Sequence, residues 1–189
     1  MSTRHLHVLL AALSLTCFAA TAQADELKLI KKGSKVSFVG GKPDGTTHAG
    51  GFKEFEVKAT ADFENPTKSS LNITINTASL WADDDKLANH LKSPDFFGVR
   101  KHPAITFEST EIVPKESDQE DGGLATIKGN LHMLGKKIAV DIPVKASVTE
   151  ESIDLTAEFE IDRTQWGMTY GKGKINNEVK ISVRFKMKR

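Results

Sequence analysis

Few residues in this sequence have the spacing that catalysis or metal binding requires. Four histidines stand beyond the first two dozen residues, each isolated from the others: His48, His90, His102 and His132. A zinc site usually includes at least one close pair of ligands. The chain also has no GxSxG, SxxK, HExxH or GxxxxGK[ST] motif, the patterns typical of hydrolases, metalloproteases and nucleotide-binding loops. We therefore predict no catalytic residue, no metal site and no cofactor.

The segment 163–174 could contact a polar group. Arg163 ends a run of alternating apolar residues, where it could form a structural salt bridge or bind an anionic or polar head group. Trp166 and Met168 follow among glycines, and the stretch Gly171 to Lys174 could suggest a phosphate-binding loop. No helix start follows these glycines, so an ordinary loop is the simpler interpretation.

Several aromatic and methionine side chains admit two interpretations. They occupy positions 81, 96, 97, 166 and 168. They could form part of an ordinary hydrophobic core. They could equally line the mouth of an apolar tunnel, where the flexibility of methionine suits varied ligands.

The first 24 residues have the pattern of a secretory signal peptide. Arg4 supplies the positive charge, Val8 to Ala20 form the apolar stretch, and Ala22 to Ala24 offer small residues for cleavage. We predict that the mature chain begins at Asp25 and that the protein is periplasmic or secreted. The single cysteine, Cys17, lies inside this leader, so the mature chain would have neither disulfides nor thiolate metal sites.

The composition fits one soluble globular domain. The 189 residues are 39% hydrophobic and 27% charged, close to the average for such proteins, and residues 25–189 are long enough for a single core. Lys and Arg total 26 against 25 Asp and Glu, which argues against nucleic acid as a partner. After cleavage of the leader we expect no integral membrane segment.

Most of the predicted mature chain alternates between apolar and polar residues. Successive side chains of a strand point to opposite faces, so each run would have one apolar and one solvated face, as is typical of antiparallel sheets. The runs cover residues 27–31, 34–39, 55–63, 71–75, 104–112, 124–131, 138–144, 153–161 and 179–187. Polar breaks separate them, among them the acidic stretch Glu116 to Asp121, which we expect to be a solvated hairpin tip.

One stretch departs from the strand pattern. Asp83 to Asp85 precede a segment in which Leu87 and Leu91 are four residues apart, and carboxylates favour the first turn of a helix. Ser93 and Pro94 resemble a second helix start. We therefore predict one or two short helices around 83–97.

Eight or more amphipathic antiparallel strands must either stack as a sandwich or close into a barrel. Closure removes exposed strand edges, and an eight-stranded barrel can be filled by side chains or can hold one small ligand. The alternation of residues by itself does not decide between the two.

Five segments resemble the YceI family. They are His90–Phe97 (HLKSPDFF), Lys101–Thr110 (KHPAITFEST), Gly51–Phe55 after a first strand ending in Phe38, Gly129–Leu131 with Gly135–Val140, and Ile161–Gly167 (IDRTQWG). They occur in the family's order and cover essentially the whole mature chain. The segments Ser79–Asp85 and Gly40–Gly51 depart from the usual family pattern, which leaves the identity of the ligand open.

The resemblance implies an all-β, eight-stranded, antiparallel, lipocalin-like barrel that binds a long apolar molecule, such as a polyisoprenoid or an acyl lipid. We expect the following residues to contact this ligand: Phe38, His48, Phe52, Trp81, Leu91, Phe96, Phe97, Phe107, Arg163, Trp166 and Met168. Storage or transport of the lipid is the predicted role.

Two alternatives remain open at this point, a structural module with a filled core and an enzyme acting on a prenyl lipid through Arg163 with His48 or Asp83. The sequence also leaves open a homodimer and gating of the cavity by segments 40–51 and 166–176.

Overall fold

The computed structural model describes residues 24–115 and 122–189. The predicted leader, apart from Ala24, and the predicted hairpin tip at Glu116 to Asp121 lie outside this range. The strands are β1 (Asp25–Gly41), β2 (Thr47–Phe52), β3 (Phe55–Ala61), β4 (Ser70–Asn76), β5 (Leu80–Ala82), β6 (Ala104–Lys115), β7 (Gly122–Met133), β8 (Lys136–Val148), β9 (Ser152–Asp162) and β10 (Glu178–Lys188). The helices are α1 (Asp85–Lys92) and the 3₁₀ turns η1 (Pro66–Lys68), η2 (Thr77–Ser79) and η3 (Arg163–Trp166).

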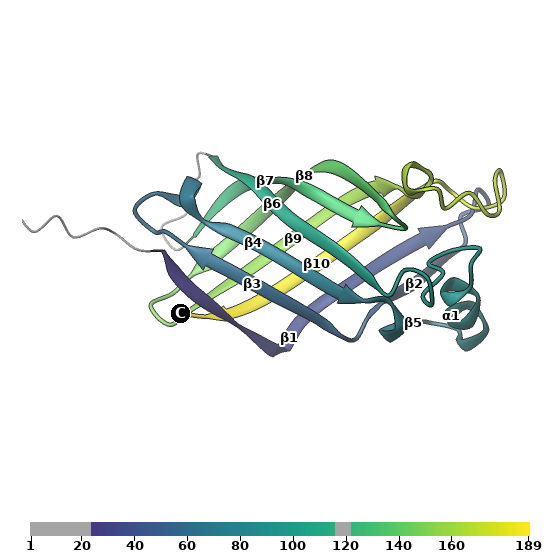
Figure 1. The fold of residues 1–189 in the computed structure, drawn as a ribbon, viewed down its shortest axis with the longest axis horizontal. Coiled ribbons are helices and arrows are strands. Elements are labelled where there is room, and N and C mark those ends of the chain that lie inside the picture. The colour runs from purple at the N-terminus through teal and green to yellow at the C-terminus, as the bar shows by residue number, and fades with distance from the viewer. Residues whose placement is uncertain (1–23, 116–121) are drawn as a thin grey trace, which may run out of the picture.

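Eight of these strands close into an antiparallel barrel, as predicted. The order is β1–β3–β4–β6–β7–β8–β9–β10, and β10 pairs again with β1. Strands β2 and β5 extend the sheet from β1 at one end of the barrel. Figure 1 shows the elongated barrel with α1, β2 and β5 at one end and the C-terminus at the other.

Strand β1 joins two of the predicted runs across a kink. Its pairing with β10 shifts register between Ile30 and Lys35, and Gly33 has a φ of +90° there, a conformation that glycine adopts without strain. Ser34 stabilises the bend, because its Oγ donates to Ile30 O and accepts the N–H of Lys186. The first half of β1 pairs with β3 and the second half with β2. The kink therefore changes the neighbour of β1 along the barrel.

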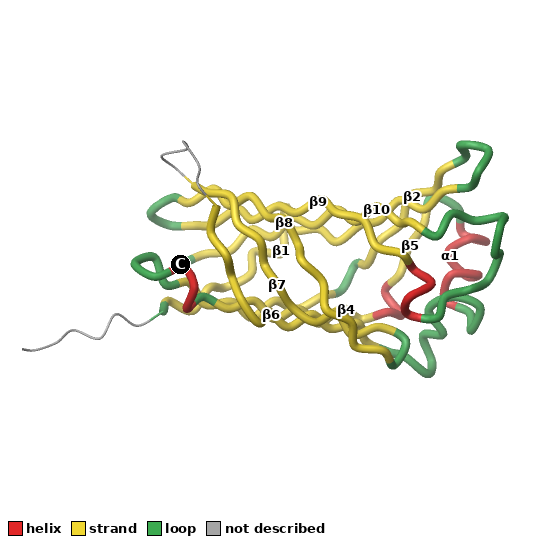
Figure 2. Tube along the Cα trace, turned by 90° about the horizontal axis from the view of Figure 1, so that it is seen from above, coloured by secondary structure: helices red, strands yellow, loops and turns green. Residues whose placement is uncertain are grey.

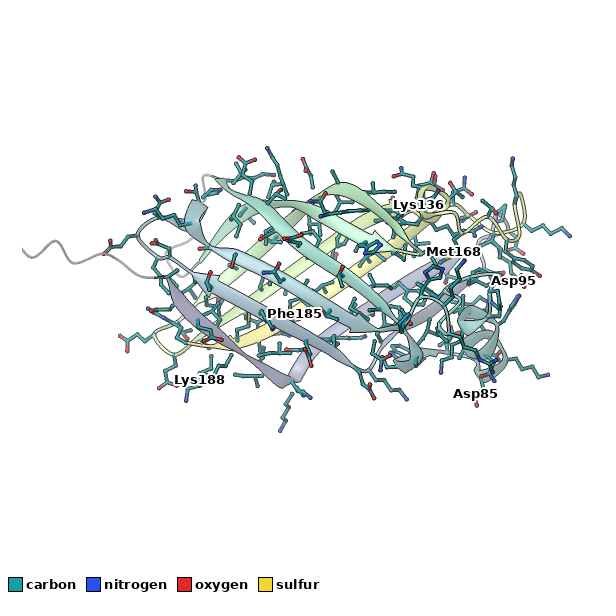
Figure 3. The ribbon with its side chains drawn as sticks, in the orientation of Figure 1. Asp85, Asp95, Lys136, Met168, Phe185 and Lys188 are labelled. Carbon is teal, nitrogen blue, oxygen red and sulfur yellow. The ribbon has the colours of Figure 1, made fainter. Side chains whose placement is uncertain are left out.

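The end of the barrel near the C-terminus is filled by apolar side chains. Leu27, Ala59, Ile153 and Met187 are all at most 6% exposed, and they come from strands that pair there. We call this region the packed end. In Figure 3, Lys188 lies at this end, Phe185 lies in the middle of the barrel, and Met168 lies towards the opposite end.

The opposite end, the mouth end, is covered by α1 and by residues 93–102 and 167–177 (Figure 2). Helix α1 forms where the acidic residues predict it, and Asp84 caps it by accepting the N–H of Leu87. The second predicted helix does not form. Ser93 instead caps the end of α1, and residues 94–97 make a turn that ends at Gly98 with a φ of +51°.

Strands β2 and β5 were not predicted, because neither carries a long alternation. Gly50 and Gly51 interrupt the alternation of apolar and polar side chains in β2. Both positions must be glycine because neighbouring atoms leave no room for a Cβ. A Cβ at Gly50 would collide with the Phe38 ring, and one at Gly51 would collide with the β1 backbone. None of the described helices is both long and apolar enough to cross a membrane.

Candidate functional site

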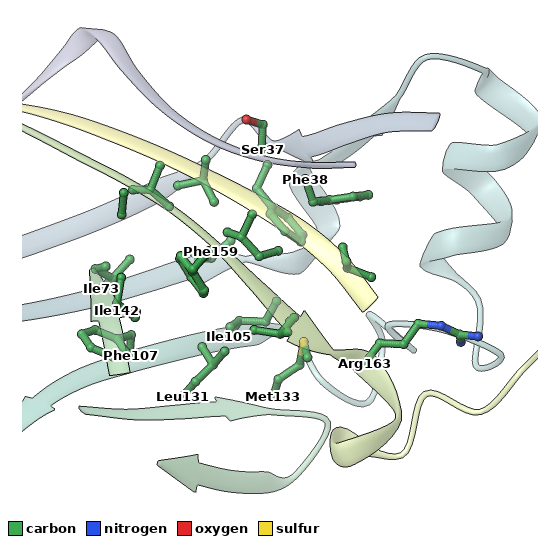
Figure 4. A pocket seen from close by; sticks show the side chains of 18 of the residues that line it. Ser37, Phe38, Ile73, Ile105, Phe107, Leu131, Met133, Ile142, Phe159 and Arg163 are labelled. Carbon is green, nitrogen blue, oxygen red and sulfur yellow. The ribbon is translucent and has the colours of Figure 1, made fainter. Parts of the chain in front are cut away.

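The barrel encloses an apolar cavity of about 190 Å³. It extends from the middle of the barrel to the mouth end, and the wall includes residues from all eight barrel strands except β3. In Figure 4 the labelled apolar side chains converge on this space. The apolar wall residues are Val36, Phe38, Phe52, Leu71, Ile73, Ile75, Leu91, Phe96, Phe97, Ile105, Phe107, Ile127, Leu131, Met133, Ile142, Val144, Leu155, Ala157, Phe159, Ile161, Met168, Ile175, Val179, Ile181, Val183 and Phe185.

No polar atom of the described residues is exposed to this cavity. Its wall is also incompletely packed, because inward-facing residues such as Ile73, Leu131 and Ile142 are only half-buried although they lie inside a closed barrel. At the packed end the inward-facing Leu27, Ala59, Ile153 and Met187 are at most 6% exposed. The interior is therefore not a filled core but holds room for hydrocarbon.

Three phenylalanines form the wall where β1, β2 and the turn after α1 meet. The ring centroid of Phe52 lies 6.1 Å from that of Phe38 and 5.5 Å from that of Phe97, and the second pair meets edge to face. The Phe38 ring lies over Gly50 on the paired strand. This cluster explains why the sequence places glycine in β2, since any larger residue would displace an aromatic wall of the cavity.

Phe107 has a similar arrangement on the opposite wall. It is 5% exposed, and a Cβ at Gly129 on β7 would collide with its ring. The glycine therefore lets the ring lie flat against the neighbouring strand and leaves the cavity open.

Arg163 is buried at the mouth end, with 3% of its surface exposed. Its Nε donates to Asn176 O, Nη1 donates to Met168 O, and Nη2 donates to Tyr170 O and Ile175 O. These carbonyls belong to the connection between η3 and β10, so Arg163 fixes that loop around its guanidinium. In Figure 4 this group points away from the apolar side chains of the cavity.

The salt bridge suggested for Arg163 is wrong within the described residues. The neighbouring carboxylate, Asp162, instead accepts the N–H and the hydroxyl of Thr164, and these hydrogen bonds lower the pKa of Asp162. Burial lowers the pKa of Arg163, because desolvation disfavours the charged form. The positive charge is stabilised by hydrogen bonds to backbone carbonyls and, more weakly, by the nearby charge of Asp162.

The structure brings eight of the eleven predicted contact residues to the cavity wall. They are Phe38, Phe52, Leu91, Phe96, Phe97, Phe107, Arg163 and Met168. The other three lie elsewhere. His48 and Trp81 are on β2 and β5, outside the wall, and Trp166 is 2% exposed and donates its indole N–H to Leu131 O.

The His48–Asp83 pair exists but is separate from the cavity. His48 Nδ1 lies 3.2 Å from Asp83 Oδ1, and both side chains are about two-fifths exposed. The pKa of Asp83 lies below its usual range, mainly because its carboxylate accepts the backbone N–H of Ala49 and to a smaller extent because of its contact with His48. Neither residue lines the cavity, so the arrangement imagined for a prenyl-lipid enzyme is not assembled. The described residues contain no group of three or more His, Cys, Asp or Glu that could hold a metal.

Most of the wall residues that sequence reasoning missed are plain aliphatic residues of the barrel strands. Ile73, Ile142 and Ile181 occupy apolar positions of runs that were predicted as strands. Their alternation already indicated the inward face, but the predicted ligand contacts were chosen mainly among aromatic residues and did not include them. Ile175 is different, because it reaches the wall from the loop held by Arg163 and no pattern signals it.

An aromatic cluster covers the cavity at the mouth end. The ring centroids of His90, Phe96 and Tyr170 lie 4.9 to 5.2 Å apart. His90 belongs to α1 and Tyr170 to the loop around Arg163, so the cluster joins these two covers. Phe96 is 6% exposed and forms part of the cavity wall.

Comparisons with known proteins agree with this geometry. The model of the YceI-like domain family matches residues 27–187. The chain is 29% identical over 183 residues to a UPF0312 protein of Pectobacterium carotovorum, covering 92% of each chain. It is 30% identical over 181 residues to Protein YceI of Salmonella newport, covering 90% of each.

Two solved structures share the fold. BcnA of Burkholderia cenocepacia matches with a TM-score of 0.71 at 23% identity, over 84% of this chain and 99% of that chain. A polyisoprenoid-binding domain from Saccharophagus degradans, implicated in plant cell wall breakdown, matches with a TM-score of 0.68 at 11% identity, over 88% of this chain and 99% of that chain. At these identities the likeness concerns the fold alone.

Proposed function

Because the chain belongs to the YceI-like domain family, we propose that it is an exported, non-enzymatic binding protein that holds the chain of a long apolar lipid in its barrel. The cargo would be a polyisoprenoid or a fatty-acid-like lipid, and the role its storage or transport. The observation that carries this proposal is a closed barrel around a cavity to which no polar atom of the described residues is exposed.

The energetics favour a long chain over a short one. Each methylene taken from water contributes about 0.8 kcal/mol, so ten of them contribute about 8 kcal/mol. Association costs on the order of 4–15 kcal/mol. A ligand of a few carbons would therefore barely bind, whereas a chain of several isoprene units would bind firmly.

The size of the cavity limits how such a chain is held. Its volume of about 190 Å³ is similar to that of an engineered cavity of about 150 Å³ that binds benzene. A long chain would therefore occupy this space with one segment and continue towards the mouth end, or would move the half-buried side chains of the wall. The polyisoprenoid-binding relative with the same fold supports a chain of this kind.

The proposal of export rests on the first residues of the chain. Met1 to Ala24 have the charged, apolar and small-residue regions of a cleavable leader. A periplasmic or secreted protein with an apolar interior would carry lipid through an aqueous compartment. N-terminal sequencing of the exported protein tests this part, and a mature start at Asp25 is the expected result.

Lipid binding is tested by loading the purified protein with a labelled C20 prenol and measuring what it retains after gel filtration. We expect the variant Ile142→Trp to retain less than about a tenth of the wild-type amount, because the indole would fill the cavity. Ala139→Trp is the matched control, since Ala139 is exposed on the same strand. It should retain as much lipid as the wild type.

Organic extraction and mass spectrometry of the protein as purified provide a second measurement. A co-purifying isoprenoid or acyl lipid, depleted in Ile142→Trp, is the expected result. If the wild type neither carries a lipid nor takes up prenyl and acyl chains, the barrel is not a lipid carrier.

A further inference from the structure

A second hollow opens to solvent beside the mouth end. It has a volume of about 730 Å³, within the range of about 300–1,000 Å³ that is typical of small-molecule sites. Its wall comes from α1, the loop 93–102, the turn between β7 and β8, and η3. Phe96 lines both this hollow and the cavity, so a single aromatic residue belongs to both walls.

Part of this wall is apolar. Trp166 is 2% exposed, and Leu134 is half-buried with a φ of +53°. Leu134 and Gly135 form the two-residue turn between β7 and β8, in which both have a positive φ. The hollow is thus amphipathic rather than a simple polar groove.

The charged side chains around the hollow are all basic. Lys92, Arg100 and Lys101 line it, and no Asp or Glu of the described chain does. None of the three forms an ion pair with another residue in the ranges that the structure covers. The nearby carboxylate of Asp95 lies 3.1 Å from His90 Nε2 instead. The hollow therefore complements a negative charge.

The cavity gives a reason for such a charge to lie here. Because no polar atom of the described residues faces the cavity, the polar end of a bound lipid cannot be hydrogen-bonded inside it and must remain outside. The basic hollow is next to the cavity at the end where the chain would emerge.

We propose that the hollow lined by Lys92, Arg100 and Lys101 binds the anionic head group, a phosphate or a carboxylate, of the lipid whose chain lies in the cavity. The inference rests on the proposed function and specifies its cargo as an anionic amphiphile. Phe96 would contact the junction between head group and chain.

The experiment compares two lipids with the same chain, geranylgeranyl phosphate and uncharged geranylgeraniol, by equilibrium dialysis against the full mature protein. We expect the wild type to bind the phosphate about tenfold more tightly, since three partly exposed charges each contribute modestly. The charge-reversed variant Lys92→Glu/Arg100→Glu/Lys101→Glu should lose this preference and keep its affinity for geranylgeraniol within about twofold. Retained binding of geranylgeraniol also shows that the variant is folded.

Lys58→Glu/Lys68→Glu/Lys145→Glu is the matched control, because it reverses three charges that lie outside the hollow. It should keep the wild-type preference for geranylgeranyl phosphate over geranylgeraniol.

Equal affinity of the wild type for the two lipids, or an equal loss of this preference in both triple variants, overturns the head-group site and leaves the proposed chain binding intact. Inorganic phosphate that binds as tightly as the prenyl phosphate would show a free-anion site and overturn the assignment to a lipid. Failure of both lipids to bind overturns the proposed function and this inference together.

Discussion

The two ends of the barrel are built from the same kinds of residue and differ in how they are filled. At the packed end Leu27, Ala59, Ile153 and Met187 exclude solvent almost completely. Around the cavity, from the middle of the barrel towards the mouth end, Ile73, Leu131 and Ile142 are inward-facing hydrocarbon side chains of similar size, yet they are only half-buried. The difference shows that the number and type of inward-facing residues do not determine whether the interior of a barrel is filled.

Strand pairing also differs between the two ends. At the packed end β1 pairs with both β3 and β10, which closes the barrel tightly. Beyond the kink β1 pairs with β10 and β2, while residues 55–58 of β3 pair with β4 alone. Backbone pairing between β1 and β3 thus closes the sheet at the packed end, whereas the mouth end is covered by α1 and the loop around Arg163.

Large-to-small substitutions at the packed end and in the cavity wall test this difference in packing. Met187→Ala at the packed end should lower the free energy of unfolding by about 2–5 kcal/mol, because it leaves a new cavity in a filled core. Ile142→Ala should cost less, about 1–2 kcal/mol, because its side chain already adjoins a void and makes fewer contacts to lose. Urea unfolding measures both. Equal costs would mean that the cavity wall is packed as tightly as the packed end.

A second prediction concerns the cover of the mouth end. Arg163→Met should lower the free energy of unfolding by about 1–3 kcal/mol, because the carbonyls of Met168, Tyr170 and Asn176 lose their donor. Hydrogen exchange should accelerate in residues 167–177, and the strands of the packed end should stay protected. Acceleration spread evenly over the barrel would show that Arg163 supports the whole fold rather than this loop.

The smallest predicted effect is electrostatic and lies on the outer face towards the packed end. Hydrogen bonds from Arg184 lower the pKa of Asp154. A carboxylate with a lowered pKa stabilises the fold above its unfolded pKa of about 3.9, and this contribution is lost as the pH falls through the folded value. Asp154→Asn should therefore cost less than about 1 kcal/mol at pH 7, after allowance for solvent screening, and this cost should shrink as the pH falls towards 2. Thermal unfolding at the two pH values measures this, and a cost that does not depend on pH would contradict it.

Much of the fold followed from local patterns. The alternation in 153–161 and 179–187 predicted β9 and β10, and the carboxylates at 83–85 predicted the start of α1. Prediction from residue alternation failed where contacts with distant parts of the chain determine the local structure. Gly50 lies in a strand because the Phe38 ring covers it, and Ser93 ends a helix rather than starting one. Such contacts join distant parts of the chain and leave no periodic signal.

The sequence by itself determined that this chain forms antiparallel strands with one hydrocarbon face each, because residue alternation matches the geometry of a strand. It also placed most aromatic residues that reach the cavity. Only the tertiary structure decided that the barrel closes, that its mouth end stays open inside, and that Trp81 and Trp166 lie outside the cavity wall. The reason is that pairing partners and the balance between side-chain volume and enclosed space are properties of the assembled sheet, not of any one strand.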